Sequence, residues 1–103
     1  MGNRDGAEPV RILLAEDDDD DFYLTERALK EYRLRNEISR VKDGEELMRY
    51  LRGRGEFKGA VRPAEPSLIL LDLNMPKMDG REALREIKSD PMLRHIPVVV
   101  LTT

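Results

Sequence analysis

The chain has 103 residues, a formal net charge of −3 at pH 7 and no cysteine. A chain of this length usually forms one domain, and without cysteine it can hold neither a disulfide nor a thiolate metal site. No apolar run approaches the roughly 18 residues that span a bilayer, and the acidic balance argues against a nucleic-acid-binding domain. We therefore expect one small cytoplasmic domain that binds neither membranes nor nucleic acid.

The first half of the chain predicts two strands and two helices. Residues 1–9 are polar and are expected to form a disordered tail, and the continuous apolar run at 12–15 is typical of a strand buried on both faces. A helix should follow, and its apolar stripe is expected to consist of Leu24, Ala28 and Tyr32, with Leu29 beside them. Residues 37–41 alternate in polarity and predict an outer strand with one wet face. The apolar positions of the second helix are expected to be Leu47, Met48 and Leu51.

The second half repeats this alternation. A long loop rich in glycine and proline is expected at 52–67, and two further buried strands are expected at 68–71 and 98–101. Between these strands, Asp79 is placed to cap a third helix, with Glu82 three residues on. Strands that alternate with helices predict a doubly wound parallel α/β sheet with right-handed crossovers.

Polar side chains follow three of the predicted strands directly. Glu16 and Asp17 follow the first, Asp72 follows the third and Thr102 follows the fourth. Ligands of such sheets bind beyond the carboxyl ends of the strands, so these side chains should meet at one edge. A cluster of carboxylates without histidine or cysteine suits Mg²⁺, and an aspartate can itself accept a phosphoryl group. The acids at 18–21 are better explained as caps of the following helix.

The segment 70–80, Leu-Leu-Asp-Leu-Asn-Met-Pro-Lys-Met-Asp-Gly, resembles the phosphoacceptor signature of response-regulator receiver domains. Glu16 and Asp17 after the first strand, and Thr102 thirty residues after Asp72, extend the resemblance over residues 10–103. The long loop, together with the Leu-Thr-Thr ending, is similar to single-domain regulators that are paired with phytochrome-type histidine kinases. The resemblance implies a flavodoxin-like topology and a place in a two-component phosphorelay.

The resemblance also implies a role for each site residue. Asp72 would be phosphorylated by a histidine kinase, and Mg²⁺ would be held by Glu16, Asp17, Asp72 and the backbone carbonyl of Asn74. Thr102 would be the switch hydroxyl that moves toward the phosphoryl group. The protein would then signal by changing conformation and would not turn over a small molecule.

The end of the sequence departs from the family pattern. The chain ends where the family has its fourth helix, and we find no lysine to assign to the family's phosphoryl-contacting position; Lys77 lies in the loop after Pro76. We therefore expect a receiver domain truncated after the fourth strand, without the fourth helix, fifth strand and fifth helix. An exposed strand edge invites pairing with another chain, which predicts a homodimer or a swapped dimer.

Two other function classes remain open from the sequence. The first is a Mg²⁺-dependent phosphatase or phosphotransferase with an aspartate nucleophile, but such an enzyme needs a second acid two residues later, where Asn74 stands. The second is a nucleotide- or flavin-binding sheet of the same topology. No glycine-rich phosphate-binding loop follows the first strand, which argues against that class.

Overall fold

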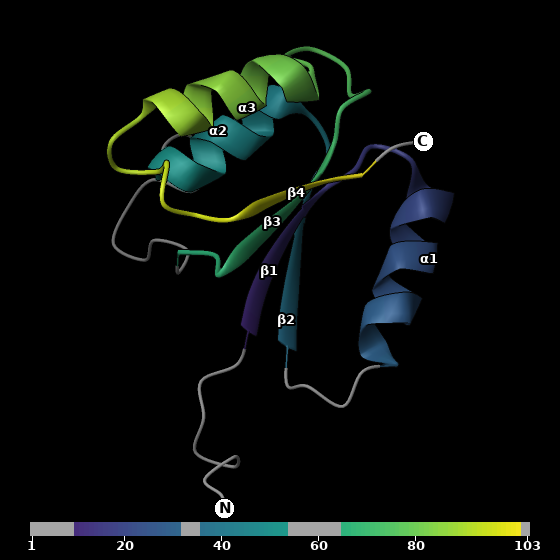
Figure 1. Cartoon of the computed structure of the whole chain (residues 1–103). Coiled ribbons are helices and arrows are strands. Elements are labelled where there is room, and N and C mark those ends of the chain that lie inside the picture. The colour runs from purple at the N-terminus through teal and green to yellow at the C-terminus, as the bar shows by residue number, and fades with distance from the viewer. Residues whose placement is uncertain (1–9, 32–35, 54–64, 102–103) are drawn as a thin grey trace, which may run out of the picture.

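A four-stranded parallel sheet forms the centre of the protein, which we describe from a computed structural model over residues 10–31, 36–53 and 65–101. The strands lie in the order β2-β1-β3-β4 (Figure 1). Their bounds are β1 Val10–Ala15, β2 Asn36–Val41, β3 Leu68–Asp72 and β4 Val98–Leu101. The doubly wound parallel sheet predicted from the sequence is confirmed. The predicted tail at 1–9 and most of the loop predicted at 52–67 lie outside the described residues.

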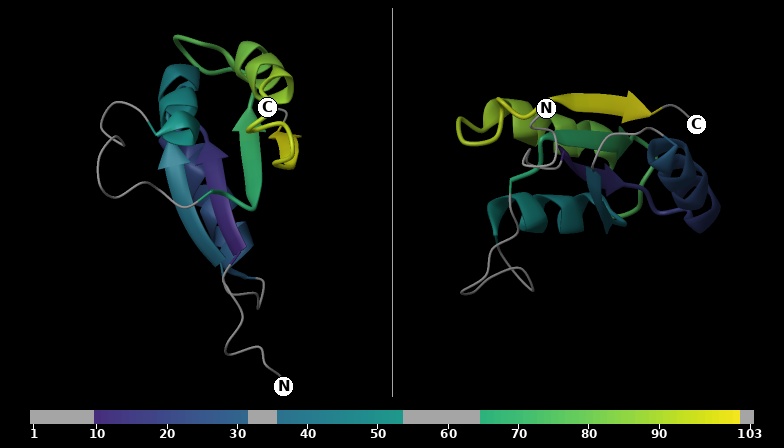
Figure 2. Two further views of the ribbon diagram at one scale, coloured as in Figure 1. Left: turned by 90° about the vertical axis from the view of Figure 1, so that its left-hand side faces the viewer. Right: turned by 90° about the horizontal axis from the view of Figure 1, so that it is seen from below.

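The register of the sheet brings the ends of β1 and β3 together. Ala15 at the end of β1 pairs with Leu71 of β3 on one side and with Val41 of β2 on the other. Asp72 pairs with Leu101 of β4. Because the strands run in the same direction (Figure 2), their carboxyl ends share one edge of the sheet.

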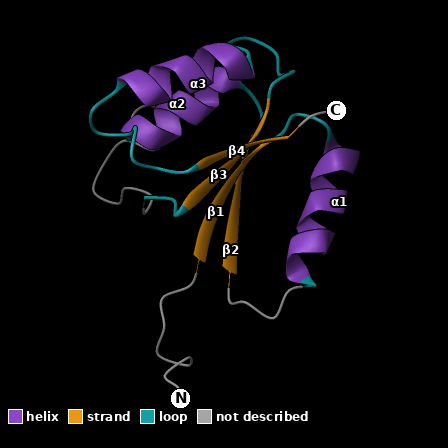
Figure 3. Cartoon of the chain, viewed as in Figure 1, coloured by secondary structure: helices purple, strands orange, loops and turns teal. Residues whose placement is uncertain are grey.

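Two helices cover one face of the sheet, α2 (Gly44–Arg52) and α3 (Gly80–Ser89), and α1 (Asp19–Lys30) lies against the other (Figures 1 and 3). The core under α2 and α3 contains the three apolar positions predicted for the second helix. The buried members that these two helices contribute are Leu47, Met48, Leu51, Ala83 and Ile87. The two faces of the sheet therefore carry separate hydrophobic clusters, as alternate residues along each strand point to opposite sides.

The face of α1 that packs on the sheet differs from the predicted stripe. Leu24 is 64% exposed and Ala28 is exposed, whereas Phe22 and Leu29 pack against the cluster formed by β1 and β3. The predicted stripe is therefore wrong for Leu24 and Ala28 and confirmed for Leu29, and Tyr32 lies outside the described residues. Phe22 and Leu29 are seven residues apart, which also places them on one face of a helix. The four-residue spacing alone did not indicate which of the two stripes faces the sheet.

An aspartate directly precedes each described helix and caps its first turn. Asp18 accepts a hydrogen bond from the N–H of Asp21, Asp43 from that of Glu46, and Asp79 from that of Glu82. These bonds satisfy amide groups that the first turn leaves without partners, which confirms the capping interpretation of Asp18 and Asp79. Within the described ranges, we find no helix with the length and apolar character that a transmembrane span requires.

Candidate functional site

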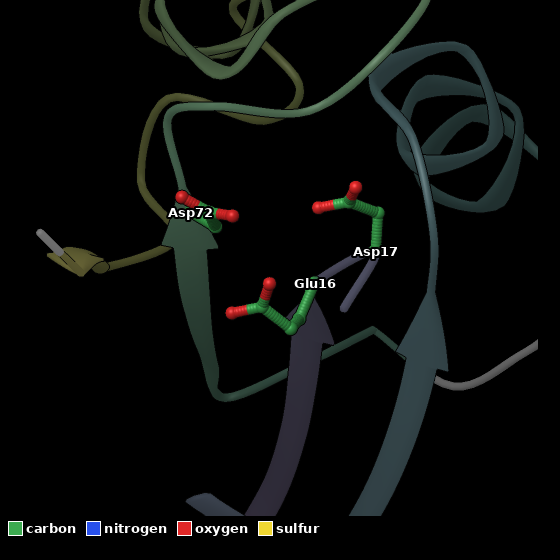
Figure 4. A group of neighbouring side chains, drawn as sticks. All are labelled: Glu16, Asp17 and Asp72. Atoms are coloured by element: carbon green, nitrogen blue, oxygen red, sulfur yellow. The ribbon is translucent and has the colours of Figure 1, made fainter. Parts of the chain in front are cut away.

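Three carboxylates meet at the carboxyl edge of the sheet. Glu16 and Asp17 directly follow β1, and Asp72 is the last residue of β3. Each offers an oxygen, and these three oxygens lie within 4.8 Å of one another. Figure 4 shows the three side chains directed toward a common space between the two strand ends. The sequence prediction that these acids gather at one edge is therefore confirmed.

The backbone after β1 holds Glu16 in place. Its N–H donates to the carbonyl of Val41 at 3.0 Å, which continues the pairing of β1 with β2 for one more residue. Its carboxylate Oε2 accepts from the N–H of Asp18 at 3.3 Å. Asp18 in turn caps α1. The end of β1 and the start of α1 are thus linked through Glu16 and Asp18.

The turn after β3 holds Asp72. Its Oδ1 accepts from the N–H of Asn74 at 3.0 Å, and the N–H of Gly80 donates to the carbonyl of Leu73, also at 3.0 Å. A Cβ atom at Gly80 would lie only 2.5 Å from the carbonyl oxygen of Asp72 and 2.6 Å from Cα of Leu73. The start of α3 can therefore approach the end of β3 this closely because residue 80 has no side chain.

Burial makes the negative charge of this cluster costly. Glu16 is 2% exposed and Asp72 is 3% exposed, while Asp17 faces solvent. Burial, together with the neighbouring carboxylate of Asp72, raises the pKa of Glu16 to about 7, although the hydrogen bond from Asp18 opposes the rise. Crowded anions of this kind are stabilised by a cation among them.

The donor set fits a hard divalent cation. Among the described residues, no basic side chain forms an ion pair with Glu16, Asp17 or Asp72. Three carboxylate oxygens, one of them open to solvent, suit Mg²⁺, because this ion prefers oxygen ligands and keeps several waters. The residues present therefore match the cofactor expected from the sequence.

The remaining predicted site residues have different outcomes. Asn74 lies next to the cluster, since its amide bonds to Asp72, and the role of its carbonyl stays a prediction. Thr102 lies outside the described residues. The sequence reasoning did not single out Arg40, whose Nε donates to the backbone carbonyl of Glu16 at 3.0 Å. The signal available was the alternation of β2, which places Arg40 on the same inward face as Ile38, close to the strand end.

A family model described as the response regulator receiver domain matches residues 12–103. The chain belongs to this receiver domain family. The match includes Glu16, Asp17 and Asp72, so the conserved domain and the cluster of acids coincide in this chain. This finding confirms the receiver domain and the flavodoxin-like fold that the resemblance implied.

Relatives of this receiver domain are response regulators, and some of them are named as phytochrome or bacteriophytochrome response regulators. The chain is 48% identical over 95 residues to the response regulator Rcp1 of Synechocystis, covering 92% of this chain and 63% of Rcp1. The structure of the phosphorylated cyanobacterial phytochrome response regulator RcpA is 52% identical, with a TM-score of 0.83, and the match covers 93% of this chain and 66% of RcpA. A Mn²⁺-bound form of Rcp1 is 48% identical, with a TM-score of 0.83, and the match covers 92% of this chain and 66% of that one. The chain thus spans less than two thirds of Rcp1.

Proposed function

We propose that this receiver domain accepts a phosphoryl group from a phytochrome-type histidine kinase onto Asp72 and changes conformation in response. The observation that carries the proposal is the convergence of Glu16, Asp17 and Asp72 within 4.8 Å at the carboxyl edge of the sheet. The similarity to RcpA, which is named as a phytochrome response regulator, supports the choice of kinase class. A kinase of this type would meet the domain in the cytoplasm.

Asp72 is suited to be the nucleophile of this transfer. An oxygen of its carboxylate attacks phosphorus, the P–N bond of the kinase phosphohistidine breaks, and its electron pair returns to the imidazole nitrogen. The N–H of Asn74 holds Oδ1 of Asp72, so one oxygen is fixed by the turn. We assign the attack on phosphorus to the other oxygen, Oδ2, which this backbone hydrogen bond does not engage.

Glu16, Asp17 and Asp72 are suited to hold Mg²⁺ together, with the backbone carbonyl of Asn74 as a further ligand. Bound there, Mg²⁺ would neutralise charge on the phosphoryl oxygens, which is the main requirement of phosphoryl transfer. The carboxylates of Glu16 and Asp17 lie beside that of Asp72, at the end of the neighbouring strand β1 (Figure 4). Thr102 would contribute the hydroxyl that contacts the phosphoryl group after transfer.

The phosphatase alternative lacks support from the comparisons and from the residues. The family match is to a signalling domain. Asn74 stands where an aspartate-nucleophile phosphatase needs its acid, and an amide cannot transfer protons at neutral pH. Asp72 would therefore be phosphorylated once per signal and not in rapid turnover.

Phosphotransfer from a purified phytochrome-type histidine kinase tests the proposal. The kinase is autophosphorylated with labelled ATP, freed from ATP and mixed with the chain in Mg²⁺ or in EDTA. We expect label to move to the chain in Mg²⁺ only, and to be released by hydroxylamine, which cleaves acyl phosphates. Label that stays on the kinase, or that resists hydroxylamine on the chain, would contradict the assignment.

A further inference from the structure

Arg40 connects β2 to the backbone that follows β1 and to the start of α1. Its Nε donates to the carbonyl oxygen of Glu16 at 3.0 Å, and its Nη2 forms an ion pair with Oδ1 of Asp19 at 2.9 Å. The guanidinium also lies 4.4 Å from the centre of the Phe22 ring. The Arg40 side chain is 17% exposed, whereas that of Asp19 is 68% exposed, so the guanidinium is largely covered while its acidic partner faces solvent. The Arg40 side chain therefore contacts both the backbone directly after β1, at Glu16, and the first turn of α1, at Asp19.

We propose that Arg40 is a positioning residue that sets the geometry of Glu16 and Asp17 for divalent-cation binding. This inference rests on the proposed metal site. The carbonyl that Arg40 holds belongs to the peptide unit that joins Glu16 to Asp17, and a peptide unit is planar. Holding its oxygen fixes the orientation of the plane from which both acidic side chains depart.

A second contact from β2 completes the support. The N–H of Glu16 donates to the carbonyl of Val41, the residue after Arg40. The two peptide units that flank Glu16 are therefore both held by the end of β2, one through backbone and one through the Arg40 side chain. Without Arg40, the carbonyl of Glu16 would lose this partner, and the 3.3 Å hydrogen bond from the N–H of Asp18 to the Glu16 carboxylate would be the remaining contact that restrains the peptide plane leading to Asp17.

The charge of Arg40 acts in the opposite direction to this positioning role. A cation near the site weakens Mg²⁺ binding by repulsion, and Asp19 offsets part of that charge. Lysine at position 40 keeps the positive charge but has neither the Nε–H donor nor the planar group that lies over Phe22. The variant Arg40→Lys therefore separates the two roles.

Isothermal titration calorimetry with MgCl₂ on the metal-stripped full chain tests the inference. We expect the Mg²⁺ dissociation constant to rise about tenfold in Arg40→Lys, the lower end of the range for residues that orient metal ligands. The matched control is Arg11→Lys, since Arg11 pairs with Glu37 and lies five residues before Glu16 on β1, about 16 Å away along the strand. This control should bind Mg²⁺ like the wild type.

The possible outcomes separate the inference from the proposed site. A wild-type chain that binds no Mg²⁺ would overturn the metal site and the inference with it. Wild-type affinity in Arg40→Lys would overturn the inference alone, because this variant keeps the charge and loses only the Nε–H donor and the planar group. Weaker binding in Arg40→Lys, with Arg11→Lys unchanged, supports positioning.

A loss of stability is distinguished from positioning by measuring unfolding in EDTA. A purely structural role would lower the denaturation midpoint of Arg40→Lys yet leave the Mg²⁺ affinity of the folded fraction unchanged, which would overturn the inference. If Arg40→Lys does not fold, Phe22→Leu replaces it, because leucine keeps apolar packing but removes the ring beside the guanidinium. We expect about threefold weaker Mg²⁺ binding in that variant, and unchanged binding would count against the inference.

Discussion

Replacing Glu16 with glutamine should make the metal-free protein more stable at alkaline pH. The pKa of Glu16 is raised from 4.5 to about 7 in the folded protein, so between these values the folded chain binds more protons than the unfolded chain. The contribution of Glu16 to the free energy of unfolding is therefore complete below about pH 4.5 and is lost as the pH rises through 7. With about 1.4 kcal/mol per unit of pKa, the loss between pH 5 and pH 8 is roughly 2–3 kcal/mol. Glutamine at position 16 avoids this loss because it does not ionise.

Urea denaturation followed by circular dichroism, in EDTA at pH 5 and pH 8, measures this difference. The free energy of unfolding of Glu16→Gln minus that of the wild type should be roughly 2–3 kcal/mol larger at pH 8 than at pH 5, which means that the variant gains stability relative to the wild type. The control is Glu37→Gln on β2, whose side chain is 61% exposed. The reasoning is refuted if Glu16→Gln follows Glu37→Gln at both pH values. With Mg²⁺ at pH 8, the wild type should become more stable than Glu16→Gln, because only the wild type keeps all three carboxylates that bind the ion.

Three further predictions concern metal binding and the local structure around the site. Because Mg²⁺ displaces the proton of Glu16, the affinity measured by calorimetry should rise about tenfold from pH 6 to pH 8 and stay flat in Glu16→Gln; equal pH dependence in both proteins would contradict this. Gly80→Ala should lower the free energy of unfolding by about 1–3 kcal/mol in urea, since its Cβ would lie 2.5 Å from the carbonyl oxygen of Asp72; unchanged stability would show that the turn relaxes freely. Asp43→Ala should cost about 1 kcal/mol by removing the cap that accepts from Glu46, whereas Asp43→Asn should cost much less, and an equal loss in both would argue against capping.

The sequence was sufficient to predict the central part of the fold because β1 and β3 are covered on both faces. A strand of this kind must be apolar at nearly every position, which gives a continuous run that few other elements produce. The position of the acids followed from the same argument, since Glu16 and Asp72 come where the buried runs end. Parallel strands bring such ends to one edge, so the candidate site could be located before any coordinates were considered.

The inward face of α1 could not be predicted in the same way. The helix carries apolar residues on two sides, and the periodicity of Leu24 and Ala28 is as regular as that of Phe22 and Leu29. The choice depends on tertiary packing, because Phe22 lies beside Arg40 while Leu24 is left in solvent. Spacing along one helix contains no information about a cation on a neighbouring strand.

Arg40 was missed for a related reason. An arginine near the end of an outer strand normally has its charge in water, so the alternation that places Arg40 on the inward face does not by itself indicate which groups its guanidinium contacts. Its contacts reach Glu16 and Asp19, which are more than twenty residues away along the chain. Only the pairing of β2 with β1 brings these groups together.

The most direct test of the account is mass spectrometry of the intact chain after incubation with acetyl phosphate and Mg²⁺. The wild type should gain one phosphoryl group, and Asp72→Asn should gain none. Asp79→Asn is the matched control, since Asp79 lies in the same loop and its amide replacement can still cap α3, so this variant should be labelled like the wild type. A phosphoryl adduct that persists in Asp72→Asn, or a wild type that stays unlabelled, would contradict the assignment of Asp72 as the phosphoacceptor.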